Sequence, residues 1–71
     1  MAMPLSLVDL NQEVIIKFIR GNDKVMKHMN DLGFVVGAVV KPVQKLGGNL
    51  IVAIKDSRIA IDESMARKII V

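Results

Sequence analysis

Residues 38–61 read AVVKPVQKLGGNLIVAIKDSRIAI, three apolar runs separated by two short breaks. The runs are rich in Val and Ile, whose branched side chains favour strands. The breaks hold Gly47-Gly48 and Asp56-Ser57, residue types that favour tight turns. We expect both glycines of the first break to adopt positive φ angles. The stretch therefore predicts strands over 38–44, 50–55 and 58–61, joined by a hairpin loop over 45–49 and a turn over 56–57.

Side-chain alternation within these strands predicts one face toward a core. In the run 50–55, three aliphatic side chains share a face: Leu50, Val52 and Ile54. Pro42 in the preceding strand has no backbone N–H to donate. We therefore expect that strand to have an edge or solvent-facing segment at Pro42.

Upstream of these strands, the sequence predicts a helix over residues 24–32. Its apolar residues recur at helical spacing and form one stripe, Val25, Met29 and Leu32, with Met26 beside it. Asn22 or Asp23 is suited to cap the first turn, and Gly33 is suited to end the helix with a left-handed φ. A helix of about two to three turns is too short to be stable alone, so the stripe is expected to pack on the sheet.

The two ends of the chain are expected to complete the fold. Residues 13–20 predict a first strand that directs three apolar side chains to one side: Val14, Ile16 and Phe18. Three leucines upstream are suited to cover the core: Leu5, Leu7 and Leu10. Downstream, Asp62 is placed to cap a short helical turn over 63–67, and residues 68–71 predict a last strand. Five short strands with one helix inserted after the first describe a small all-β domain, an antiparallel barrel that is closed or nearly closed.

The chain has 71 residues and no cysteine. This length accommodates one domain, which we place over residues 1–71. The absence of cysteine excludes disulfides and thiolate metal sites and, in so small a domain, favours the cytoplasm. The longest apolar stretch, 34–40, is far shorter than the ~20 residues that cross a bilayer, and residues 1–10 do not resemble a signal peptide. We therefore expect a cytoplasmic protein that does not insert into a membrane.

The net charge of +3 raises the question of a nucleic-acid partner. The basic residues are interleaved with Asp and Glu, whereas a nucleic-acid site needs basic side chains clustered on one face and, for single strands, aromatic side chains for stacking. The chain has no Trp or Tyr, and both Phe18 and Phe34 are expected inside the barrel. We expect no nucleic-acid partner. A small nucleic-acid-binding barrel stays open as an alternative, which salt-dependent binding to RNA or DNA would favour.

No arrangement typical of catalysis is recognisable in the sequence. A serine nucleophile needs a base that a third group orients, and nothing in the sequence places the single His28 in that way. Gly47-Gly48 is followed by Asn49, not by the Lys and Ser or Thr of a phosphate-binding loop. We therefore expect neither an enzyme nor a bound cofactor.

Two features bear on metal binding. His28 and Asp31 are three residues apart on the expected helix and could share a face, but two ligands are too few for a strong Fe(II) site. Thioethers suit Cu(I) better than Fe(II), so we interpret three methionines as core residues: Met26, Met29 and Met65. We expect no metal site of high affinity, and weak binding of Fe(II) stays open. A metal-sensing domain is a second alternative, which measurable Fe(II) affinity would favour.

Residues 32–37 read LGFVVG and closely resemble the Leu-Gly-Phe-x-x-Gly element of the ferrous iron transport protein A (FeoA) family. Other pieces resemble the family in the same order. Residues 7–10 resemble its opening Leu-x-x-Leu, residues 58–61 its Arg-x-Ala-Leu strand, and residues 66–71 its terminal Ala-x-x-Ile-x-Val. The chain departs from the family at Gln12, where Gly is frequent, and in the shortened loop 46–49.

This resemblance implies a five-stranded SH3-like barrel in the bacterial cytoplasm. It implies an accessory role in ferrous iron uptake, in contact with the transporter FeoB, whose cytosolic part is a GTP-binding domain. Related barrels form the C-terminal domains of diphtheria-toxin-repressor-type metal regulators, and the metal-sensing alternative follows from that relation.

Protein–protein contact is the function that these exclusions leave. An SH3-like fold does not by itself imply binding of proline-rich peptides, because the aromatic walls of such a groove are missing here. Leu46, in the expected hairpin loop, is either a contact or a lid over the barrel mouth. The candidate contact residues are Lys24, His28, Lys45 and Leu46. The glycines expected to form turns or caps are Gly33, Gly37, Gly47 and Gly48. Weak self-association also stays open.

Overall fold

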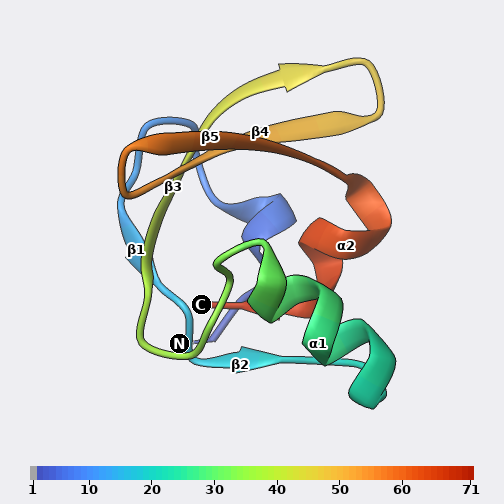
Figure 1. Cartoon of the computed structure of the whole chain (residues 1–71). Coiled ribbons are helices and arrows are strands. Elements are labelled where there is room, and N and C mark those ends of the chain that lie inside the picture. Colours follow the sequence, from blue (N-terminus) through green and yellow to red (C-terminus); the bar gives the residue numbers. More distant parts are fainter. Residues whose placement is uncertain (1) are drawn as a thin grey trace.

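The computed structural model describes residues 2–71 as two antiparallel sheets with two α-helices beside them (Figure 1). The elements in chain order are η1 (Leu5–Leu7), β1 (Val14–Ile15), β2 (Phe18–Ile19), α1 (Asp23–Asp31), β3 (Val39–Leu46), β4 (Asn49–Ile54), β5 (Ser57–Asp62), α2 (Glu63–Lys68) and β6 (Ile69–Ile70). The larger sheet has the order β1-β3-β4-β5, and the smaller one pairs β2 with β6. The two ends of the chain meet, because Met3 and Val71 exchange backbone hydrogen bonds of 2.9 and 2.8 Å. A small, mostly β fold with one helix inserted early is therefore confirmed.

Two consecutive hairpins form most of the larger sheet. β3 continues to Leu46 and β4 begins at Asn49, so the expected loop over 45–49 is wrong and the turn is Gly47-Gly48 alone. Gly47 has a φ of +62°, whereas Gly48 has no positive φ. A glycine with positive φ at the first turn position is typical of a type II′ turn, whose twist matches that of the strands. The strand pairing can therefore continue to the end of the hairpin.

The second turn also lies slightly earlier than expected. It consists of Lys55 and Asp56, and Ser57 already pairs with Ile54. Lys55 has a φ of +52°, a conformation in which a residue with a β-carbon is uncommon. The two-residue turn keeps β4 and β5 in register. The hairpin therefore tolerates the positive φ of the exposed Lys55.

The expected first strand, residues 13–20, is divided between the two sheets. β1 pairs with β3, and β2 pairs with β6. The change occurs between Ile16, whose N–H donates to Ala38 O at 3.0 Å, and Lys17, whose N–H donates to Ile70 O at 2.8 Å. Phe18 consequently faces outward and is 55% exposed, which corrects the expectation that it lies inside. A corner between two sheets resets the side-chain alternation that a single strand would keep.

The hydrogen-bonded strands do not form a closed ring. The larger sheet ends at β5, and α2 connects β5 to β6 of the smaller sheet (Figure 1). The expected five strands correspond to β1 with β2 as one bent strand, followed by β3, β4, β5 and β6. Within residues 2–71, this open barrel leaves the outer edge of β5 without a strand beside it.

Pro42 lies where β3 loses its neighbour on one side. β1 pairs only with Val39 and Val40, so the later part of β3 has a paired strand on the β4 side alone. The β3–β4 register shifts between Pro42 and Gln44. The expected edge position at Pro42 is therefore confirmed, but a solvent-facing segment there is wrong, because Pro42 is buried and its carbonyl accepts a hydrogen bond of 2.6 Å from Asn11 N.

The helix α1 has the caps that its sequence predicts, and it lies one residue earlier than the expected range 24–32. The Asn22 side chain accepts a hydrogen bond of 2.9 Å from Val25 N, and Gly33, which follows the C-cap residue Leu32, has a φ of +100°. Met29 is buried, while the rest of the apolar stripe is half-buried. The capped helix therefore rests on the core by one narrow face.

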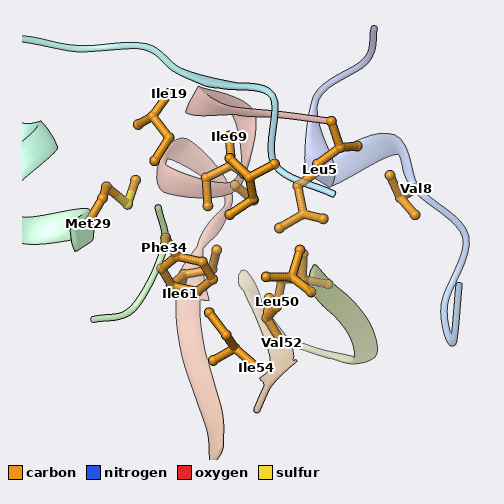
Figure 2. Close-up of a cluster of buried hydrophobic side chains, with 14 residues drawn as sticks. Leu5, Val8, Ile19, Met29, Phe34, Leu50, Val52, Ile54, Ile61 and Ile69 are labelled. Atoms are coloured by element: carbon orange, nitrogen blue, oxygen red, sulfur yellow. The ribbon is translucent and has the colours of Figure 1, made fainter. Parts of the chain in front are cut away.

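The core lies between the two sheets and the helices. Figure 2 shows the Phe34 ring among buried side chains from β4, β5 and α1. Phe34 has no exposed surface. Leu5 is also buried, but Leu7 and Leu10 are exposed, so the expectation that all three cover the core is wrong. The single turn of η1 can direct only one of its leucines inward.

Candidate partner-binding surface

The carboxylates and the single histidine do not gather into a metal-ligand cluster. No group of three or more His, Asp or Glu side chains that could hold a metal ion occurs within residues 2–71. His28 is exposed on α1, and Asp31 accepts a hydrogen bond of 3.2 Å from Lys27 instead. The same part of the chain buries no polar or charged side chain.

Lys24 and His28 lie over a hollow between the two α-helices. Their spacing of four residues places them on one side of α1, next to α2. The hollow, here called the α1–α2 hollow, is lined by Lys24, Val25, His28, Met29, Met65 and Lys68. Met29 is buried and Met65 half-buried, so the floor is apolar. Lys24, His28 and Lys68 line the hollow beside this floor, and among residues 2–71 no Asp or Glu lines it.

Each of the two helices that border this hollow begins with its own N-cap. Asn22 caps α1, and the Asp62 side chain accepts a hydrogen bond of 2.7 Å from Met65 N at the start of α2. Met65 and Lys68 are one helical turn apart, so α2 presents an apolar and a basic side chain to the same hollow. Each cap therefore stabilises the start of its own helix, and the packing of the two helices brings together side chains that are distant in the sequence.

Lys45 and Leu46 lie at the end of the β3–β4 hairpin. Leu46 is 59% exposed, which excludes the alternative that it covers the barrel mouth. Lys45 lines a second hollow, here called the hairpin hollow, together with Ser6, Gly47, Gly48, Asn49, Leu50, Glu63 and Ala66. An exposed leucine beside a lysine is thus presented at the hairpin tip.

The four candidate residues form two surfaces and not one. Lys24 and His28 line the α1–α2 hollow, Lys45 lines the hairpin hollow, and the two hollows share no residue. α2 contributes to both hollows and lies between the hairpin tip and α1 (Figure 1). A partner that touches all four residues must therefore pass over α2.

A third surface was missed from the sequence. Ile15 of β1 pairs with Val39 of β3, and these side chains are 55% and 50% exposed. Ile15 shares a further hollow with Met3 and Leu7. Strand alternation could have revealed it, because consecutive apolar residues on a strand cannot all face the core.

The fold and these surfaces can be compared with known proteins. The family model described as FeoA domain matches residues 3–71, nearly the whole chain. The chain belongs to the FeoA family. A protein of Methanocaldococcus jannaschii assigned as Fe(2+) transport protein A is 32% identical over 68 residues, which cover 96% of this chain and 83% of that protein. The FeoA resemblance that rested on the LGFVVG element and the ordered pieces around it is therefore confirmed.

Solved structures of FeoA proteins have the same architecture. An iron uptake regulatory protein (FeoA) superposes with a TM-score of 0.90 at 23% identity and covers 99% of this chain and 93% of its own. The zinc complex of Stenotrophomonas maltophilia FeoA, described as a prokaryotic SH3 domain protein, has a TM-score of 0.79 at 30% identity and covers 94% and 86%. The SH3-like fold class of this FeoA-family chain is confirmed.

The fold also occurs in a metal regulator. A manganese-dependent transcriptional repressor superposes with a TM-score of 0.86 over 99% of this chain and 40% of that one, at 15% identity. Identity this low shows a shared fold and nothing of shared function. Within residues 2–71, no helix of this FeoA-family chain is both long and apolar enough to span a bilayer.

Proposed function

We propose that this FeoA-family chain is a non-enzymatic, cytoplasmic accessory protein of ferrous iron uptake that binds the cytosolic GTP-binding part of the transporter FeoB. Membership of the family supports a place in ferrous iron transport. The related S. maltophilia protein is described as a candidate activating factor of ferrous iron transport. The observation that carries the proposal of a contact is the α1–α2 hollow, with its basic rim and apolar floor.

The chemistry of the α1–α2 hollow defines the partner segment that would fit it. Met29 and Met65 offer a polarizable, adaptable floor for one apolar side chain of the partner. Lys24 and Lys68 at the rim favour carboxylates on either side of that side chain. A short acidic segment with an apolar anchor in its middle meets both requirements.

The hairpin tip supplies the second contact. Leu46 is an exposed apolar side chain, and Lys45 beside it continues the basic character of the surface. Between the two contacts lies α2, whose Arg67 and Glu63 pair at 3.3 Å. This arrangement favours a partner that spans the hairpin tip, α2 and the α1–α2 hollow.

The size of the domain limits the strength of the contact. One face of so small a domain offers about 800 Å² or less, so the complex is weak or transient. Basic rim residues speed the encounter with an acidic surface more than they strengthen the complex. Binding should therefore weaken as salt is raised.

The proposal is tested by titrating the purified chain with the cytosolic part of FeoB and by measuring ferrous iron uptake in cells. Leu46→Asp should weaken binding about tenfold or more, a loss of ~1.4 kcal/mol, whereas Lys24→Glu should chiefly slow association and reduce its dependence on salt; both should reduce uptake. Lys55→Glu, the same charge reversal in the distant β4–β5 turn, is the matched control and should bind as the wild type does. Circular dichroism and melting temperature verify that all three variants fold.

Two outcomes would contradict parts of this proposal. A folded Leu46→Asp variant that binds and supports uptake at the wild-type level would show that Leu46 is not a contact. If deletion of the whole protein leaves ferrous iron uptake unchanged, the assignment to iron transport is wrong.

A further inference from the structure

Within the described residues 2–71, the outer edge of β5 has no strand beside it. β5 pairs with β4 on one side and is the last strand of its sheet. Within residues 2–71, no backbone hydrogen bond joins Ser57–Ile61 to any segment other than β4. An exposed edge of this length is a ready template for another strand.

The strand register shows which backbone groups point outward from this edge. Residues of an antiparallel pair alternate between those that hydrogen-bond to the neighbouring strand and those that do not. Glu63 N donates to Gly48 O at 3.2 Å, so the odd-numbered residues of β5 hydrogen-bond toward β4. The even-numbered residues therefore direct their backbone groups to the free edge: Arg58, Ala60 and Asp62.

These three residues are also exposed, and the two charged ones lack ion-pair partners within the chain. Neither Arg58 nor Asp62 takes part in a salt bridge within residues 2–71. Asp62 uses Oδ1 to cap α2, which leaves the second carboxylate oxygen free. Ala60 between them is small and lets another backbone approach closely.

A second copy of the same strand fits this edge in one register. If two β5 strands run antiparallel with Ala60 opposite Ala60, Arg58 of each copy lies opposite Asp62 of the other. Directly opposite residues have β-carbons about 5 Å apart, within reach of an Arg–Asp ion pair. If the register shifts by two residues in either direction, Ala60 of the second copy lies opposite Arg58 or Asp62. The Arg58–Asp62 ion pairs between the copies are then not formed. On the inner face, half-buried Ile59 would lie opposite Ile61 of the second copy.

We propose that the outer edge of β5 pairs with the β5 edge of a second copy of this chain, centred on Ala60, to form a symmetric dimer. The Ala60 backbone groups bond across the axis, and Asp62 N–H donates to Arg58 O of the other copy. The pairing uses the same edge of both copies, so it closes and does not propagate into a fibre. It does not depend on the proposed transporter contact, which lies on other elements.

The dimer is expected to be weak. Its contact is a single strand edge, far below the ~1,600 Å² that a stable complex of standard size buries in total. The ion pairs are exposed, so they select the register more than they add affinity. Association should be visible at millimolar protein concentration and not at micromolar concentration.

Single cysteines test the register, because the chain has no cysteine of its own. Ala60→Cys places two thiols on the dimer axis with α-carbons about 5.5 Å apart, within the α-carbon range of a disulfide, and with β-carbons about 5 Å apart that must approach by about 0.5–1 Å for the bond to form. Arg58→Cys is the matched control on the same strand, since its two copies would lie about 14 Å apart along the strands. Under mild oxidation at millimolar concentration, Ala60→Cys should form a disulfide dimer at least tenfold faster than Arg58→Cys.

The wild-type chain gives an independent measurement. Sedimentation equilibrium should show a reversible dimer that Arg58→Asp abolishes by placing two carboxylates opposite each other. Equal cross-linking rates for the two cysteine variants would overturn the register. A wild-type chain that stays monomeric at millimolar concentration would overturn the dimer, and the edge would then be available to a strand of another protein.

Discussion

Val25 leaves no room for a β-carbon at Gly21. A Cβ on Gly21 would lie 2.7 Å from Val25 Cγ1, a distance that atoms in proteins do not tolerate without movement. Gly21 also has a φ of +133°, which residues with a side chain rarely adopt. Only a glycine therefore fits at position 21 in the passage from β2 into α1.

We therefore expect Gly21→Ala to lower the stability of the fold. Backbone strain of this kind costs about 1–3 kcal/mol, and the clash with a half-buried valine adds to it. In a domain of this size, a loss of 2 kcal/mol lowers the melting temperature by roughly 10 °C. Gly48→Ala is the control, since Gly48 has no positive φ and nothing lies within 4 Å of its Cβ position. Equal melting temperatures for the two variants would contradict the prediction.

The two phenylalanines should respond very differently to substitution. Phe34 has no exposed surface, so Phe34→Leu should destabilise the fold by about 1–2 kcal/mol through the partly filled space that it leaves. Phe18 is 55% exposed, so Phe18→Leu should change the stability by less than about 0.5 kcal/mol. Urea unfolding of both variants measures the difference. A larger loss for Phe18→Leu would mean that the first strand is not divided between the sheets.

The cap of α1 should matter to stability and to the α1–α2 hollow. Asn22→Ala removes the acceptor for Val25 N and should cost about 1 kcal/mol. Asn22→Asp keeps an equivalent acceptor and should be nearly neutral. Thermal unfolding gives the stability of both variants. Amide hydrogen exchange should show faster opening of the first turn of α1 in Asn22→Ala alone.

The isolated chain should bind Fe(II) weakly or without saturation. His28 is exposed, and no cluster of three ligands occurs in the described residues. Anaerobic calorimetric titration with Fe(II) should give the same weak binding signal for the wild type and for His28→Ala. Stoichiometric micromolar binding that His28→Ala removes would contradict this prediction and would favour the metal-sensing alternative.

Local rules predicted the parts of the fold that depend on neighbouring residues. Asn22 and Gly33 bound α1 because an N-cap acceptor and a left-handed residue act within one turn. Asp62 begins α2 for the same reason. Both tight turns were expected within one or two residues, and the FeoA family followed from the LGFVVG element together with the order of the other matching pieces.

The candidate contact residues could be chosen from the sequence but not assembled. Lys24 and His28 share a helix face by their spacing, which sequence shows. Their neighbours Met65 and Lys68 come from a helix about forty residues later, and only the packing of α1 beside α2 brings them there. Lys45 and Leu46 are likewise placed on the other side of α2 by the hairpin.

The sequence by itself determined the capped helix, the two hairpins and their order, because caps, turns and strand alternation are interactions between residues close in the chain. The family followed from several short motifs in a fixed order. The tertiary structure alone decided where the first strand bends, since that depends on which distant strand each half can bond to. Ile16 donates to Ala38 O, whereas Lys17 donates to Ile70 O, and this switch turns Phe18 outward. The open edge of β5 was decided in the same way, because whether an edge is paired depends on strands that come from elsewhere in the chain.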